Sequence, residues 1–350
     1  EQILSLRKAL RECSSKSKNW ILSLLEVLFD IMAKASIGKR LGSIRSIDSI
    51  VVGVQNIDEA TDLWVNQFGL DIVSERDGID IDLSRLWQLN DDEVIKQALL
   101  ATPKIDVGKI HLVQFKNPST PVRQNANTTD LGPKNLDVTC LDLPSKYKKL
   151  IKQGYQFRSE YVGYQIESIG ADVLEVQMPG HDHTNIIFVE QLGEEIQLSN
   201  KGYGGITSLV TIVSDLDEET DFFKDIFSLR EAVSEDLFGE HVEKMVGLPK
   251  GGGLRLNLLE GDEIDRYGRV ELVSYIGAEK QDDLYKIANP PALGTLHCIF
   301  RVEDITNIKN KLKKRSVNYK EHGLLDLIFG KGEIISFRSP AGLRIEVQQL

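Results

Sequence analysis

Cysteine is scarce in this sequence, which contains only Cys13, Cys140 and Cys298. An odd number of widely spaced cysteines, with no CxxC pair, indicates neither a disulfide framework nor a cysteine zinc site. This usage fits a reducing compartment, so we expect a cytoplasmic protein.

Positive charge is also in short supply. The chain has 42 Lys and Arg against 53 Asp and Glu, a formal net charge of −11 at pH 7. Such a chain repels a phosphate backbone and an anionic membrane surface, and no concentrated basic stripe offsets this. We therefore expect neither a nucleic-acid nor a membrane partner. A small-molecule substrate or ligand is the expected partner.

Long apolar runs are missing as well. The one candidate, Trp20 to Met32, is interrupted by Glu26 and Asp30 and is too short to span a bilayer. Its apolar residues recur at helical spacing, so residues 1–44 predict a helical extension. This extension would pack on the rest of the chain or on a second subunit in a possible homodimer; a membrane anchor is the alternative.

An internal duplication dominates the remaining sequence. Residues 47–60 and 206–219 each predict a β-branched strand, an Asn or Asp helix N-cap and an acidic first helical turn. Residues 108–115 mirror 268–275 in the same way. Two further pairs keep the same separation of about 160 residues: Leu131–Asn135 with Leu293–His297, and Phe188–Leu192 with Glu346–Leu350.

The duplicated halves predict the fold class and the domains. Each half contains two units in which a strand is followed by a helix and then by further strands, an α+β pattern. We predict four βαβββ modules paired into two domains with curved mixed sheets. The domains would span residues 45–195 and 203–350, divided by a polar, glycine-rich segment.

These modules, with the phrase of a hydrophobic strand, Asp215-Leu216, a helix and Phe222-x4-Phe227-x-Leu229, resemble the vicinal oxygen chelate superfamily. That group includes glyoxalase I, bleomycin-resistance proteins and extradiol dioxygenases. The resemblance covers roughly residues 45–350 and implies a cavity lined by the curled sheet. It also implies up to four ligands, from the first and last strands of each module, pointing into that cavity.

At these places the C-terminal half has Ser208, Glu271, His297 and Glu346. The resemblance therefore implies a divalent metal (Fe, Mn, Co, Ni or Zn) held by Glu271, His297 and Glu346. Ser208 departs from the His or Gln usual in the family. Either carboxylate could also leave the metal and act as a catalytic proton shuttle.

Neighbouring side chains complete the predicted site. Ser208, Arg301 and Arg344 are the candidate substrate-binding residues, because either arginine could grip a substrate carboxylate. Each arginine could equally neutralise a glutamate. A register error of one residue would exchange faces and favour Asn257 over Glu271.

The N-terminal half has Ser49, His111, Asn135 and Phe188 at the matching places. One possible ligand of four predicts a domain without metal. The alternative is a metal-free pocket in which Asn135, Asp137 and His111 hydrogen-bond an organic ligand.

Two classes of function follow. The first is a metal-dependent enzyme acting on a small oxygenated compound, by proton transfer as an isomerase or lyase, or by dioxygenation. The second is a metal-free protein that binds or sequesters a small molecule, as bleomycin-resistance proteins do. A third possibility is an assembly role for the N-terminal helices, with neither pocket active.

Overall fold

The computed structural model describes residues 45–350 apart from 263–265 and 279. These residues belong to one unit that starts at Ile44. The helical extension predicted for residues 1–44 lies outside the described residues. Within the described part, no helix is both long enough and apolar enough to cross a membrane.

Four modules follow one another along the chain, as predicted. The first comprises β1 (Ser49–Val54), α3 (Ile57–Asp62) continued by the π-helical η1 (Leu63–Gln67), β2 (Asp71–Asp77), α4 (Ile81–Leu86), β3 (Val94–Ala101) and β4 (Lys109–Phe115). The second comprises β5 (Gly132–Cys140), α5 (Leu143–Lys152), β6 (Val162–Ile166), the short η2 (Glu167–Ile169), β7 (Ala171–Pro179), the short η3 (His181–His183) and β8 (Asn185–Gln191).

The second half repeats this order. The third module comprises β9 (Tyr203–Ile212), α6 (Leu216–Phe227), β10 (Arg230–Phe238), α7 (Glu240–Val246), β11 (Gly253–Glu260) and β12 (Arg269–Ile276). The fourth comprises β13 (Gly294–Val302), α8 (Ile305–Lys314), β14 (Tyr319–Leu327), β15 (Gly330–Arg338) and β16 (Arg344–Gln349).

Each module's first helix begins at a side-chain cap. The carboxylate or amide oxygen of the capping residue accepts a hydrogen bond from a backbone N–H two or three residues further on, which satisfies a donor that the first helical turn leaves unpaired. The four capping residues are Asn56, Asp142, Asp215 and Asp304. The caps predicted at the starts of the two halves are thereby confirmed.

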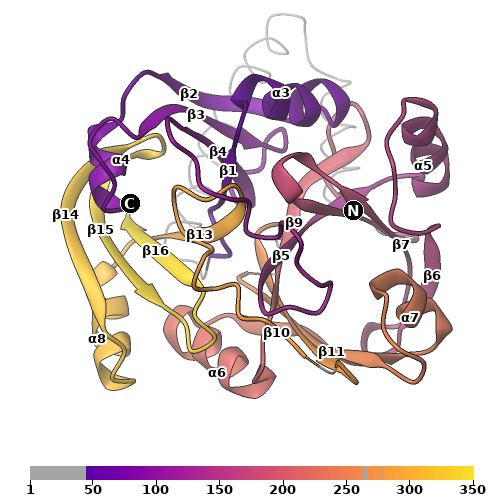
Figure 1. Ribbon diagram of the computed structural model, residues 1–350. Coiled ribbons are helices and arrows are strands. Elements are labelled where there is room, and N and C mark those ends of the chain that lie inside the picture. The colour runs from indigo at the N-terminus through magenta and orange to yellow at the C-terminus, as the bar shows by residue number, and fades with distance from the viewer. Residues whose placement is uncertain (1–44, 263–265, 279) are drawn as a thin grey trace, which may run out of the picture. The chain divides into compact units, whose positions relative to one another are not determined.

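The strands form two mixed eight-stranded sheets. One has the order β14-β15-β16-β13-β1-β4-β3-β2 and the other β10-β11-β12-β9-β5-β8-β7-β6. We name them by their central strands, the β1–β13 sheet and the β5–β9 sheet. Figure 1 shows the yellow strands of the fourth module beside the indigo first module.

The pairing of modules differs from the predicted one. β1 pairs antiparallel with β13, and β5 pairs antiparallel with β9, so each sheet takes one module from each half of the sequence. The segments 45–195 and 203–350 therefore do not correspond to the two sheets. The reason is tertiary: β5 is buried along its whole length and needs a partner strand at each edge, and β9 supplies the second.

A pair of glycines joins the two sheets. Ile47 N–H, beside the β1–β13 sheet, donates to the Gly268 carbonyl at 2.7 Å, and Ile206 N–H of the β5–β9 sheet donates to the Gly108 carbonyl at 3.3 Å. Both glycines have positive φ, and a Cβ on either would lie within 2.4 Å of a backbone oxygen. These equivalent positions in the duplicated halves are thus glycine for the same steric reason.

The apolar core has three parts. The largest lies between the two sheets and includes the buried faces of α3, α5, α6 and α8. A second fills the other face of the β1–β13 sheet, beneath α4, and a third covers part of the corresponding face of the β5–β9 sheet, beneath α7. We call these last two surfaces the inner faces of the sheets, and the candidate sites lie on them.

Candidate active site

The four residues predicted as ligands fall into two pairs on different sheets. Ser208 Oγ lies 3.0 Å from Glu271 Oε2 on the β5–β9 sheet. His297 Nε2 lies 3.4 Å from Glu346 Oε1 on the β1–β13 sheet. The structure therefore does not bring Glu271 to His297 and Glu346, because module three pairs with module two and module four with module one.

On the β1–β13 sheet the pair acquires a third member, His111. Val51 is aligned with both His111 and His297 in the strand ladder, so the two imidazoles project from the same inner face. His111 Nε2 lies 2.9 Å from Gln97 Oε1. Both imidazoles are fully buried, and Glu346 is 1 % exposed.

Trp87 closes this inner face. Its indole N–H donates to Glu346 Oε1 at 2.8 Å, and its ring centroid lies 5.6 Å from that of His297 and 6.5 Å from that of His111. Leu83 and Leu86 of α4 pack in the same apolar cluster. The two histidines and the glutamate are therefore sealed from solvent.

The charges in this cluster are already balanced. Nε and Nη2 of Arg344 each lie 2.9 Å from Glu346 Oε1 and donate to it. Burial opposes ionisation of Glu346, but His297 and Arg344 outweigh it and hold the pKa of Glu346 below its usual range. Burial lowers the pKa of His297, and lowers that of His111 to about 3, so the His111 imidazole is neutral at pH 7.

The inner face of the β5–β9 sheet carries a different cluster. Asp137 is opposite Ser208 in the ladder, and Glu271 and Glu175 lie on flanking strands at positions that project from the same side. Ser208 Oγ is 2.8 Å from Asp137 Oδ2 and 3.0 Å from Glu271 Oε2. Because a hydroxyl has a single proton, Ser208 donates to one of these carboxyl groups and accepts from the other in its protonated form, which holds the two groups close together.

Glu175 has its own partner. The Tyr164 hydroxyl donates to Glu175 Oε2 at 2.5 Å. Burial, partly opposed by this hydrogen bond, raises the pKa of Glu175 to about 7. Burial followed by repulsion from Glu271 and Glu175 raises the pKa of Asp137, and burial raises that of Glu271. These three carboxyl groups thus hold protons more tightly than ordinary carboxyls do.

A cavity of about 120 Å³ lies against these carboxyl groups. Its polar wall is formed by Asp137, Glu175, Glu271, Ser208, Tyr164, Thr207, Gln191 and one cation, Arg269. The rest of the wall is mainly apolar: Ile166, Ile169, Val173, Val189, Val233, Leu256 and Leu258. This arrangement, a concave apolar space with a few convergent polar groups, is typical of a small-molecule site.

The comparisons with known proteins agree with this architecture. Residues 205–347 match the sequence model of the Glyoxalase/Bleomycin resistance protein/Dioxygenase superfamily. A glyoxalase I variant from Zea mays has a similar structure, with a TM-score of 0.59 at 11 % identity, covering 87 % of this chain and 93 % of the other. A Bacillus subtilis protein described as a dioxygenase gives a TM-score of 0.54 at 14 % identity, covering 88 % of this chain and 86 % of the other.

This protein has the vicinal oxygen chelate fold. No curated protein sequence matches the chain. At 11–14 % identity the two solved structures define the fold and leave the reaction open.

The vicinal oxygen chelate fold implies a metal. The donor atoms on each inner face can therefore be compared with the ligands that a metal needs. On the β1–β13 sheet, buried polar atoms without a hydrogen-bond partner remain on His111, His297 and Glu346, and two imidazoles with a carboxylate suit several transition metals. The arrangement does not fit, however. The Trp87 ring lies among the three groups, and Arg344 already neutralises the carboxylate.

On the β5–β9 sheet the donors are all oxygens. Asp137 Oδ1 is buried without a hydrogen-bond partner, and Asp137 and Glu271 lie on either side of Ser208 Oγ. Two adjacent carboxyl groups of this kind fit a hard divalent cation. Among the described residues, no three His, Cys, Asp or Glu side chains converge as a ready-made metal site.

The predicted substrate-binding residues are separated in the same way. Ser208 lines the cavity of the β5–β9 sheet. Arg344 is bound to Glu346, which corresponds to the alternative of a neutralising arginine. Arg301 Nη1 lies 4.0 Å from Oδ1 of Asp48, the residue directly before β1. Neither arginine lines the cavity beside the three carboxyl groups.

The alternative pocket of the N-terminal half is divided too. Asn135 and Asp137 lie on the β5–β9 sheet, and His111 lies on the other. Sequence reasoning missed Glu175 and Tyr164. A usable signal existed for Glu175: the neighbouring alternate positions Leu174, Val176 and Met178 are apolar, so Glu175 projects from the opposite face of the strand.

Proposed function

We propose that this protein is an enzyme that transfers a proton on a small oxygenated compound, in the chamber formed by Asp137, Glu175 and Glu271. The single observation that carries the proposal is the gathering of three carboxyl groups at one cavity, with Asp137 and Glu175 buried and Glu271 half-buried. Burial raises the pKa of all three, that of Glu175 to about 7, and a carboxyl group that changes protonation state near neutral pH has the property that a general acid or base needs.

The two parts of the cluster suit different roles. Glu175, with a pKa of about 7 and the Tyr164 hydroxyl as donor, is suited to accept a proton from a carbon next to a carbonyl. Asp137 and Glu271 share protons with Ser208 between them, so one of the two is suited to donate a proton to a substrate oxygen. Groups of the same type thus divide into base and acid by their surroundings.

A divalent cation fits this proposal. Asp137 and Glu271 would hold it as carboxylates, in place of the proton that one of them donates in the metal-free site, and an all-oxygen set favours Mn among the metals that we considered, or Mg. When bound, the ion would polarise a substrate oxygen and stabilise negative charge on it. Glu175 would remain outside the ion's ligands and move the proton. We favour proton transfer over dioxygenation because the imidazoles lie on the sealed face.

Proton transfer can be tested without knowing the natural substrate. A panel of small 2-oxo and 2-hydroxy acids and aldehydes, with and without Mn²⁺ or Mg²⁺, would be incubated with the protein in deuterated water. Loss of the proton signal next to the carbonyl would be followed by NMR. We expect exchange with wild type and loss of exchange in Glu175→Gln, whereas Glu303→Gln, an exposed carboxylate, would behave as wild type. Wild type that exchanges no compound contradicts the proposal.

Metal content distinguishes the two inner faces. Wild type, Glu271→Gln and His297→Ala would be incubated with Mn, Mg, Fe, Co, Ni and Zn ions, desalted, and measured by inductively coupled plasma mass spectrometry. We expect Glu271→Gln to lose the ion and His297→Ala to keep it. The reverse pattern would instead place the metal among His111, His297 and Glu346.

The second candidate function is metal-free binding of a small molecule. It is favoured by the apolar part of the cavity wall, which suits sequestration of a hydrophobic compound. Wild type without bound metal and without proton exchange, but with a higher melting temperature in the presence of apolar ligands, would favour it.

A further inference from the structure

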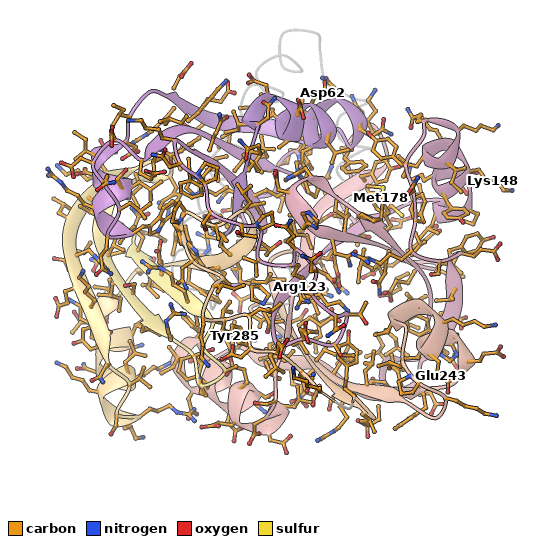
Figure 2. The ribbon with its side chains drawn as sticks, viewed as in Figure 1. Asp62, Arg123, Lys148, Met178, Glu243 and Tyr285 are labelled. Carbon is orange, nitrogen blue, oxygen red and sulfur yellow. The ribbon has the colours of Figure 1, made fainter. Side chains whose placement is uncertain are left out.

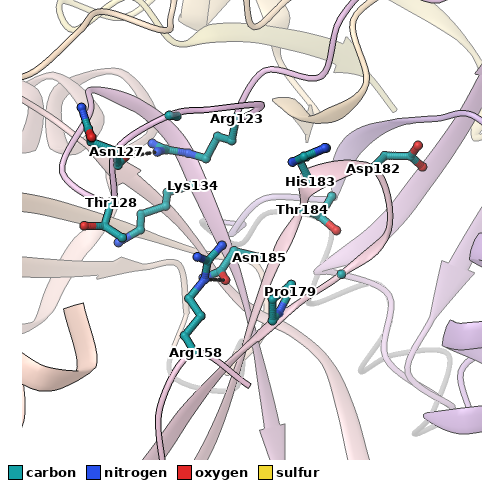
Figure 3. Close-up of a pocket in the computed structure, with 12 residues that line it drawn as sticks. Arg123, Asn127, Thr128, Lys134, Arg158, Pro179, Asp182, His183, Thr184 and Asn185 are labelled. Carbon is teal, nitrogen blue, oxygen red and sulfur yellow. Dashed lines mark hydrogen bonds between the residues drawn. The ribbon is translucent and has the colours of Figure 1, made fainter. Parts of the chain in front are cut away.

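A second cavity, of about 330 Å³, lies in the β5–β9 sheet where the neighbouring strands β5 and β8 begin. Figure 3 shows its wall, in which Arg123, Lys134 and Arg158 come from three different segments of the chain. Thr128, Thr184 and Asn185 add small polar groups. Three cationic side chains around one space are unusual in a chain with a net charge of −11.

None of the three cations has a carboxylate partner within the described part of the chain. The Arg123 guanidinium donates to the carbonyls of Pro133 and Asp130, each at 2.9 Å. Lys134 Nζ donates to the Tyr275 hydroxyl at 2.7 Å, and Arg158 Nε donates to Asn185 Oδ1 at 2.9 Å. All of these acceptors are neutral.

The one acid in the cavity wall is already engaged. Asp182 Oδ2 lies 3.2 Å from His181 Nδ1, and both side chains are largely buried. No carboxylate is thus paired directly with any of the three cations, which repel one another across the cavity. Burial, followed by repulsion from Arg123 and Arg158, lowers the pKa of Lys134 to about 7, and burial lowers that of Arg123 to about 10.

We infer that this cavity binds the anionic group, a carboxylate or a phosphate, of a small molecule. An anion would relieve the repulsion among the three cations and would accept hydrogen bonds from guanidinium groups whose planar shape matches both chemistries. The volume is within the roughly 300–1,000 Å³ range of small-molecule sites.

The anion would lie near the carboxyl chamber. Lys134 stands three positions before Asp137 on β5, and its pKa responds to both Asp137 and Glu175. A substrate with its anionic group beside Lys134 would extend along the inner face towards Glu175. That the anion belongs to the substrate rests on the proposed function; binding of the anion itself does not.

Isothermal titration calorimetry of the full chain at low salt tests the inference. Inorganic phosphate and malonate, a small dicarboxylate, would be titrated separately, and the one that binds identifies a phosphate or a carboxylate ligand. We expect saturable binding of one of them, weakened roughly tenfold or more in Arg158→Gln, since a charge-assisted hydrogen bond is lost. Arg158 is exposed at the edge of the cavity, so this variant should fold.

The matched control is Lys148→Gln, which removes an exposed positive charge from α5 (Figure 2) and should bind as wild type does. Lys134→Met should weaken binding as Arg158→Gln does, with folding checked by thermal melting. Absence of saturable binding of either probe to wild type would overturn the inference, as would equal losses in Arg158→Gln and Lys148→Gln. Because Glu175→Gln should still bind the anion, failure of this site and failure of the proposed proton transfer are separable.

Discussion

The indole N–H of Trp87 donates to Oε1 of Glu346, 2.8 Å away, and thereby connects residues 259 positions apart in the sequence. Trp87 follows α4 in the first module, whereas Glu346 belongs to the last strand of the fourth. The bond ties the two modules of the β1–β13 sheet together. It also places a donor on the same Oε1 that lies 3.4 Å from His297 Nε2.

Replacing Trp87 with Phe should reduce stability more than the same change at Trp64. Trp87 donates to an ionised carboxylate, whereas Trp64 donates to the neutral acceptor His181 Nε2 at 3.1 Å. A hydrogen bond to a charged group contributes about 1.5–3 kcal/mol and a neutral one about 0.5–1.5 kcal/mol. Urea denaturation should show this order in the free energy of unfolding. Equal losses would contradict an ionised Glu346.

Glu175 should make stability depend on pH. The folded state holds this proton more tightly than the unfolded chain, with a pKa of about 7 against 4.5. The contribution of Glu175 is therefore fully present below pH 4.5 and is lost as the pH rises through 7, by on the order of 3 kcal/mol at most. Urea denaturation at several pH values should show a smaller decline over this range in Glu175→Gln. A parallel decline in both proteins would contradict a raised pKa.

Glu271→Gln should stabilise the protein while abolishing its function. Asp137 and Glu271 lie on either side of Ser208, where crowding of two carboxyl groups costs free energy. An amide of the same shape keeps an acceptor for Ser208 and removes the ionisable group. We expect a gain in stability at pH 7, because two ionisable carboxyl groups no longer share one site. The melting temperature measures this change, and a lower value in the variant would argue against repulsion in the cluster.

The two halves of the sequence should not fold separately. Each sheet contains a ladder between the halves, β1 with β13 and β5 with β9, and a half expressed alone would expose both strand edges. Fragments 1–200 and 201–350 should be insoluble or unfolded singly, by circular dichroism. Co-expression should recover a folded complex of the two. A soluble, cooperatively folded fragment 201–350 would contradict this expectation.

The sequence alone predicted the local structure well. The strand at Ser49–Val54, the cap at Asp215 and the strand histidine His297 all follow from patterns that span fewer than twenty residues. The duplication was visible for the same reason, since equivalent modules repeat the same local hydrogen bonds and the same alternation of apolar side chains. Local rules of this kind act wherever the segment lies in the molecule.

Which modules share a sheet was decided only by the tertiary structure. Glu271, His297 and Glu346 are each on a strand, as the sequence indicated, yet the strand order separates the first from the other two. Alternation fixes the face of a side chain but carries no information on which distant strand becomes its neighbour. β1 and β5 are buried and need a partner strand at each edge, and this need determines which modules share a sheet. The same pairing brings Asp137, Glu175 and Glu271 to one cavity.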